Sequence, residues 1–136
     1  MSRTHTTTFL LLLAVCAQAQ QGYKKVHYQM LDQAKTLLAN EDYEEAAKVY
    51  KRLLPVDPLF MEVQHDMGVC LARTPGHKEK ATVYFERGVE GRYTESYYEL
   101  AMARHGQQRF DDAVSLLDQY KTINGRMVPD ADVDRS

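Results

Sequence analysis

Small residues recur along the chain at a spacing close to 34 positions. Ala34 is followed 34 positions later by Gly68, and Gly68 is followed 33 positions later by Ala101. A fixed period of roughly 20 to 50 residues is typical of repeat proteins, in which each unit buries its apolar face only against its neighbours. The chain has 136 residues, enough for three such units and for one compact domain in total.

A second series of residues repeats in step with the first. An alanine stands 12, 13 and 12 positions after the three small residues, at Ala46, Ala81 and Ala113. Four positions beyond each alanine, on the same face of a helix, stands a large apolar residue: Tyr50, Phe85 or Leu117. The extra position of the second unit falls in residues 74–77, where proline and glycine indicate a turn that tolerates an insertion.

The two series predict three pairs of helices joined by short polar turns. The first helix of each pair is expected over residues 23–39, 59–73 and 94–107, and the second over residues 43–54, 78–89 and 110–123. Pro58, Gly91 and Gly125 follow the three second helices and are expected to end them. No strand pattern competes, so the sequence predicts an all-α fold.

The repeated residues resemble the tetratricopeptide repeat family. The first unit matches the family pattern at Ala34, Tyr43, Ala46, Tyr50 and the terminal Pro58. The second unit matches at Gly68, Leu71, Ala81 and Phe85, and the third at Tyr97, Leu100, Ala101, Phe110 and Ala113, but both lack the terminal proline. The resemblance implies a right-handed α-solenoid of three helix-turn-helix repeats, at about 27–60, 61–93 and 94–125, within a domain spanning 20–125.

A narrower resemblance concerns residues 67–81. The stretch MGVCLARTP, continued by KEKA, resembles the amino-terminal repeat module of bacterial envelope proteins that continue into a β-propeller and an OmpA-like domain. Neither later domain follows in this sequence, so only the role of the module is implied. That role is an interaction scaffold in a cell-envelope assembly, related to the outer membrane or to secretion.

The amino-terminal residues 1–19 differ from the rest of the chain. Arg3 precedes an unbroken apolar run at 9–15, and Ala17–Gln18–Ala19 has the small-x-small pattern of a cleavage site. The run is much shorter than the about 20 residues that span a bilayer, so the segment predicts a secretory signal peptide. The protein is then expected in the periplasm, at the outer membrane or secreted.

Cys16 leaves a second export reading open. Residues 13–16 are similar to the lipobox at which bacterial lipoproteins are cut and lipidated, although Val15 stands where a small residue is preferred. Membrane attachment is expected only in that case. After cleavage at Ala19, Cys70 is the single cysteine left, so no disulfide can form within the domain.

Neither catalysis nor nucleic-acid binding is predicted. The net charge of -2 lacks the clustered cations that neutralise phosphates. His27, His65, His77 and His105 show no metal-ligand spacing, and no paired cysteines or glycine-rich phosphate loop occurs, so no catalytic residue, metal or cofactor is expected. The alternative to a scaffold is a small metal-binding or hydrolytic accessory protein of the periplasm that uses His65 and His105.

In a stacked array the first helices of the pairs line a concave surface, which is where a peptide segment of another protein is expected to bind. The side chains there combine aromatic area with polar groups, as interfaces do. The predicted partner-binding residues, called the inner row below, are Tyr28, Leu31, Lys35, Leu38, Glu62, His65, Val69, Arg73, Glu95, Tyr98, Met102 and His105.

One mode of binding is not expected. Some members of the family hold a carboxy-terminal carboxylate with cations of this surface, but four of the five matching positions here are not basic: Leu31, Asp66, Glu95 and Glu99. Only Lys35 could serve, and the acidic side chains would repel the ligand.

The end of the repeats predicts an uncovered face. The second helix of the third pair carries Leu116, Leu117, Tyr120 and Ile123, and a polar acidic tail follows at 126–136. The array needs a cover, which can be Met127 with Val128, a second copy of the chain or a further domain. Weak self-association through this helix, or marginal stability, is expected.

Overall fold

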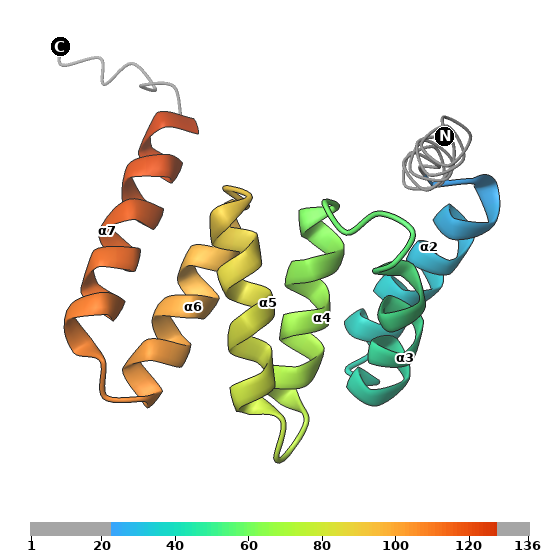
Figure 1. Cartoon of the computed structure of the whole chain (residues 1–136), viewed down its shortest axis with the longest axis horizontal. Coiled ribbons are helices and arrows are strands. Elements are labelled where there is room, and N and C mark those ends of the chain that lie inside the picture. The colour runs from blue at the N-terminus through green and yellow to red at the C-terminus, as the bar shows by residue number, and fades with distance from the viewer. Residues whose placement is uncertain (1–22, 128–136) are drawn as a thin grey trace, which may run out of the picture.

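The computed structural model describes residues 23–127, which form six helices (Figure 1). They are α2 (Lys25–Ala39), α3 (Tyr43–Leu53), α4 (Met61–Arg73), α5 (Lys78–Glu90), α6 (Thr94–Gly106) and α7 (Phe110–Met127). This part of the chain contains no strand, so the all-α prediction is confirmed. The predicted signal peptide at 1–19, Cys16 and residues 128–136 lie outside the described residues.

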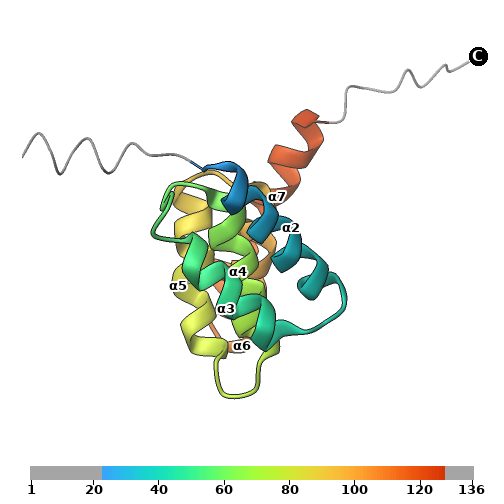
Figure 2. The ribbon, with the colours of Figure 1, turned by 90° about the vertical axis from the view of Figure 1, so that its right-hand side faces the viewer.

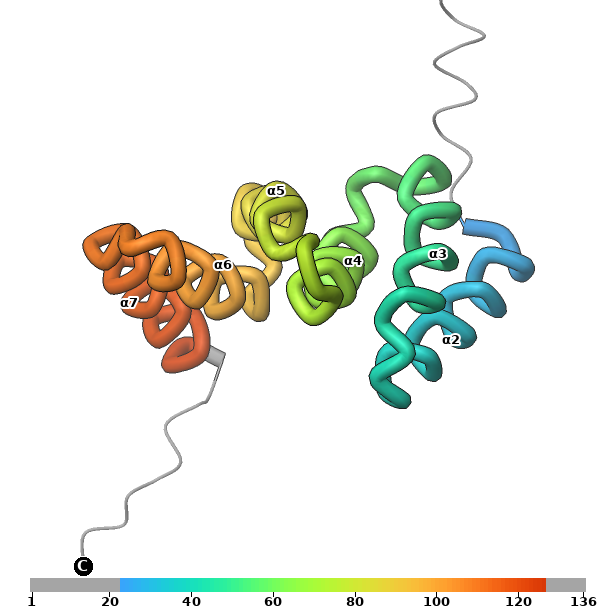
Figure 3. Tube along the Cα trace, turned by 90° about the horizontal axis from the view of Figure 1, so that it is seen from below, coloured from blue at the N-terminus to red at the C-terminus, as the bar shows by residue number. Residues whose placement is uncertain are grey.

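The helices follow one another in chain order along the long axis of the molecule, with α2 at one end and α7 at the other (Figure 1). Each helix packs against its neighbours in sequence, and α4 also touches α6. Figure 2 looks along this row from the α2 end, and Figure 3 shows it from below. Contacts mainly between helices that are neighbours in sequence are what a repeat-like succession of helix pairs produces.

The observed helix ends lie within two residues of the predicted ones, except that the last helix is four residues longer. The first helix begins at Lys25 instead of 23. The start of α4 is delayed from 59 to Met61, because the Asp57 carboxylate accepts a hydrogen bond from the Leu59 backbone nitrogen at 3.0 Å and holds a turn there. Gly125 does not end the last helix, which continues to Met127. A glycine inside a helix costs only about 1 kcal/mol, which the neighbouring residues can offset.

Gly91 does follow α5, but for a reason other than backbone freedom. Its φ is -79°, whereas the left-handed residue of this turn is Arg92 with φ 58°. A Cβ at position 91 would lie 2.2 Å from the sulfur of Met61 on α4. Glycine here therefore lets the α5–α6 turn approach the start of α4 without displacing the Met61 side chain.

The repeated residues form the core. The small residues Ala34 and Ala101 are fully buried, and the ring of Phe85 covers Gly68 so closely that a Cβ there would lie 2.6 Å from it. All three repeated alanines are buried, as are Tyr50 and Phe85. The predicted packing role of both series is confirmed, except that Leu117 is only half-buried.

The third helix pair has the weakest cover. Within residues 23–127 α7 packs closely only on α6, so Leu116, Leu117, Tyr120 and Ile123 are half-buried. Phe110 and Val114 of α7 are 54% and 58% exposed. An apolar face at this end of the row is thus present, as the sequence predicted.

None of the helices in 23–127 has the length and apolar character needed to cross a membrane.

The contact of Gly68 with Phe85 gives a stability prediction. Gly68→Ala should lower the free energy of unfolding by roughly 1–3 kcal/mol, because the added methyl group forces the buried ring to move. Gly106→Ala is the matched control, since a Cβ there meets no heavy atom within 4 Å. It should leave the stability equal or raise it by roughly 0.5–1 kcal/mol. Urea unfolding followed by circular dichroism measures both, and equal effects would contradict the packing described.

Candidate functional site

The structure sorts the twelve residues of the inner row by exposure. Six of them have exposed side chains: Tyr28, Arg73, Glu95, Tyr98, Met102 and His105. Four are half-buried: Lys35, Leu38, Glu62 and Val69. The remaining two, Leu31 and His65, are buried. Whether a partner binds this surface stays a prediction.

The expected positions of Leu31 and His65 at the surface are wrong. Leu31 is 5% exposed and belongs to the hydrophobic core. His65 is 8% exposed, and its Nδ1 lies 3.1 Å from Oγ of Ser96 on α6. The reason for His65 is that α4 packs against α3, α5 and α6 at once, so helical spacing alone underestimates how much of its circumference is covered.

The surroundings of His65 favour a neutral imidazole. Its ring lies 5.8 Å from that of Phe85 and 5.1 Å from that of Tyr93, measured between centroids. Burial lowers the pKa of His65 below its usual range. Ser96 reaches it because Gly88 on α5 has no side chain, and a Cβ there would lie 2.0 Å from the serine oxygen. The three helices α4, α5 and α6 therefore meet at a satisfied polar contact.

Two ion pairs link the first helices of successive pairs. Nζ of Lys35 on α2 lies 2.7 Å from the Glu62 carboxylate on α4, and the hydrogen bond with Glu62 raises the pKa of Lys35. The Arg73 guanidinium on α4 lies 4.0 Å from the Glu99 carboxylate on α6. Both pairs are partly exposed, so they orient the inner row more than they stabilise the fold.

Asp66 is a polar residue of this surface that the sequence pattern did not assign to the inner row. The Tyr50 hydroxyl donates a hydrogen bond of 2.9 Å to its carboxylate. Burial raises the pKa of Asp66 to about 6, although the hydrogen bond from Tyr50 acts in the opposite direction. Burial and the nearby carboxylate also raise the pKa of Tyr50. No spacing rule predicts this pair, because Tyr50 and Asp66 belong to different helix pairs.

A cavity of about 760 Å³ opens between α4, α5 and α6, next to the carboxy-terminal half of the inner row. It brings together three predicted residues, Arg73, Tyr98 and Met102. The floor includes Phe85 and Thr82, and the Gln107 amide lies 3.5 Å from the Thr82 hydroxyl. Tyr98 is 46% and Met102 40% exposed, so large apolar surface lies beside a cation and amide groups.

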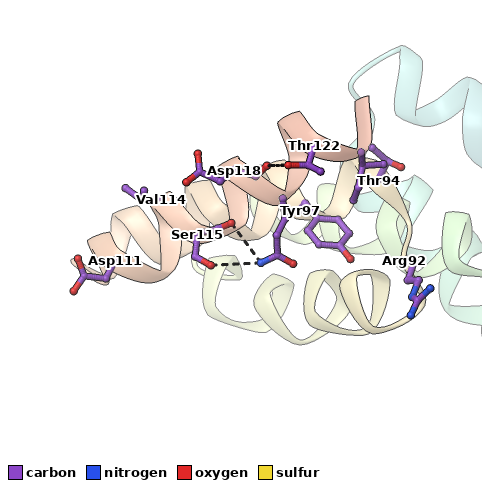
Figure 4. A pocket seen from close by; sticks show the side chains of 10 residues that line it. Arg92, Thr94, Tyr97, Asp111, Val114, Ser115, Asp118 and Thr122 are labelled. Carbon is purple, nitrogen blue, oxygen red and sulfur yellow. Dashed lines mark hydrogen bonds between the residues drawn. The ribbon is translucent and has the colours of Figure 1, made fainter. Parts of the chain in front are cut away.

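A second cavity, of about 830 Å³, lies between α6 and α7 (Figure 4). Its lining includes Tyr97, Val114 and Ile123. Several of its polar side chains bond along their own helix, as with Thr122, which donates to the Asp118 backbone oxygen at 2.8 Å. The sequence pointed to an uncovered apolar face here but not to a cavity.

The two histidines that the alternative hypothesis uses, His65 and His105, lie in different surroundings. His65 lies in the second turn of α4, whereas His105 stands at the end of α6 with its ring 5.3 Å from that of Phe110. Between residues 23 and 127, no three His, Cys, Asp or Glu side chains are grouped so that they could hold a metal ion. Cys70 is buried, and burial raises the pKa of its thiol to about 12. The two histidines are therefore not brought together.

The fold and the surface define the chain as an all-α protein of consecutive helix pairs. A scan against models of known protein families matches none of them, and no curated protein matches the chain in sequence.

The environment of Asp66 gives a prediction on pH. Because its pKa of about 6 lies above the ordinary 3.8, the native state binds this proton more tightly than the unfolded state. The carboxyl group thus makes the wild type less stable as pH rises from about 4 to 6. Asp66→Asn does not ionise and keeps an oxygen for the Tyr50 hydroxyl. The stability of the variant relative to wild type should increase across this range.

Urea unfolding at a series of pH values measures that difference. The control is Asp32→Asn, because the Asp32 side chain on α2 is exposed. The stability of Asp32→Asn should change with pH as that of the wild type does between about pH 4 and 6. Parallel curves for wild type and Asp66→Asn would contradict the assigned environment.

Proposed function

We propose that the protein is an interaction scaffold module, with no catalytic role, which binds a peptide segment of another protein on the inner row. The observation that carries the proposal is the cavity of about 760 Å³ at which Tyr98, Met102 and Arg73 lie together. Aromatic, methionine and arginine side chains are enriched at interfaces, where they combine large contact area with hydrogen bonding.

The architecture proposed for this module is a right-handed α-solenoid of three tetratricopeptide-type repeats. The support is the close contact of Gly68 with Phe85, the burial of Ala34 and Ala101, and helices that pack on their neighbours in sequence. In such an array α2, α4 and α6 share the concave side. The ion pairs Lys35–Glu62 and Arg73–Glu99 join these three helices.

The proposed cellular setting is the bacterial envelope, as an exported protein in the periplasm or at the outer membrane. Its support comes from the sequence, in the apolar run at 9–15 with the cleavage pattern that ends at Ala19. The similarity of residues 67–81 to a repeat module of envelope proteins agrees with this setting.

Substitutions in the inner row test the binding function. Cross-linking of the full chain in envelope fractions, followed by quantitative mass spectrometry, should identify a partner in a fixed ratio. The double variant Tyr98→Ala/Met102→Ala should reduce its recovery on the order of tenfold or more, because exposed anchors of this kind carry most of the binding energy.

Leu59→Ala is the control for loss of exposed apolar surface, since Leu59 is 81% exposed and precedes α4. It should leave the partner unchanged. An identical set of cross-linked proteins for the wild type and the double variant would overturn the proposal.

Weak self-association through α7 is proposed in addition, because Phe110 and Val114 expose more than half of their surface. The variant Phe110→Ser/Val114→Ser should abolish any rise in mean mass with concentration, as measured by light scattering. A wild-type chain that stays monomeric at high concentration would contradict this.

A further inference from the structure

A second groove lies between α3 and α5, which are the second helices of the first two pairs. The inner row, in contrast, lies on the first helices of the pairs. Helices α3 and α5 flank α4 (Figure 1), and a cavity of about 730 Å³ runs between them. We call it the outer groove. Its walls are Ala47, Lys48 and Lys51 with Glu44 on α3, and Lys80, Val83, Tyr84 and Arg87 on α5.

The bottom of the outer groove is apolar. Met67 and Leu71 of α4 line it and are 6% and 9% exposed. Val83 on the α5 wall is 46% exposed, and Tyr84 and Ala47 are half-buried. The apolar area open to a ligand therefore lies on the walls, at Val83, Tyr84 and Ala47, and covering it with apolar side chains is favourable.

The rim of the outer groove is basic. Five of its lining residues are basic or histidine and one is acidic: Lys48, Lys51, His77, Lys80 and Arg87 stand against Glu44. The whole chain carries a net charge of -2, so this concentration of cations is local. Charge of one sign along an apolar groove selects a ligand of the opposite sign.

The basic side chains of the rim differ in whether they already interact with other groups of the protein. Lys48 lies 2.5 Å from the Glu45 carboxylate, and the Arg87 guanidinium lies over the Tyr84 ring at 5.5 Å. Lys51 and Lys80, one on each wall, are exposed and form no ion pair with any residue from 23 to 127. These two ammonium groups remain available to an anion in the groove.

The length of the outer groove sets the size of the ligand. Its wall residues run from position 44 to 51 on α3 and from 80 to 87 on α5, two turns of each helix. Two turns rise about 10 Å, which matches an extended segment of about three or four residues.

We infer that the outer groove binds a short acidic peptide segment of a partner protein, in which carboxylates alternate with apolar side chains. The carboxylates pair with Lys51 and Lys80, and the apolar side chains cover Val83, Tyr84 and Ala47. A nucleic acid or a lipid headgroup supplies the charge without apolar side chains at this spacing, so a peptide fits better. This site lies on α3 and α5 and does not depend on binding at the inner row.

The test is selection of a random 12-residue peptide display library on the full chain. Enriched peptides should contain Asp or Glu interleaved with Leu, Val or Ile. A fluorescein-labelled copy of the best peptide should then bind in an anisotropy titration, and its affinity should fall as salt is added.

The variant Lys51→Glu/Lys80→Glu should weaken this peptide on the order of tenfold or more. Its matched control is Lys25→Glu/Lys121→Glu, which changes the net charge equally at two exposed positions away from the groove. The control should bind as the wild type does, and so should Tyr98→Ala, which belongs to the inner row.

Four results would overturn the inference. They are a library without acidic enrichment, unchanged binding by the groove variant, equal loss in the charge control, and equal binding of a labelled peptide whose apolar residues are replaced by serine. A second copy of the chain is the other occupant to exclude, because residues 130–134 read Asp-Ala-Asp-Val-Asp. Light scattering tests this occupant. If the wild type self-associates and Lys51→Glu/Lys80→Glu does not, the groove binds a second copy of the chain, and the inference of a separate partner protein is wrong.

Discussion

The close packing of Phe85 on Gly68 is the contact on which the middle of the molecule depends. It sets how near α5 comes to α4, and α6 packs on α5 and touches α4 as well. Gly88 and Gly91 extend the same principle, because they admit Ser96 and Met61 where any side chain would collide. The glycines Gly68 on α4, Gly88 on α5 and Gly91 in the following turn therefore allow α4, α5 and α6 to pack closely.

The sequence predicted the helices well because their signals are local and repeated. The alanine four positions before a large apolar residue identifies a buried helix face whatever lies around it, and the burial of Ala46 with Tyr50 and of Ala81 with Phe85 agrees. The same local reasoning failed at His65, because its burial depends on Ser96, which comes from another helix pair. At Gly91 the helix ends as predicted, but the pattern could not show that the sulfur of Met61 lies against this glycine.

The surfaces were less predictable than the core, for a related reason. Nothing in the sequence pattern distinguishes Lys51 and Lys80 from other surface lysines. They line one groove only because α3 and α5 pack on the two sides of α4. Asp66 was similarly visible only as an acid, whereas its raised pKa comes from burial beneath neighbouring helices. Surface chemistry in such a chain is a property of helix pairs taken together, and the pattern of one helix does not contain it.

The helix α4 contributes to both candidate surfaces, since Leu71 lines the outer groove and Arg73, two positions later, lines the cavity beside Tyr98. A helix with its side chains is about 10 Å thick, so segments held on the two sides would be separated by only that thickness. With both surfaces occupied as proposed, a chain of this architecture would act as a thin spacer. It can bring two extended segments into register back to back, with neither one touching the other.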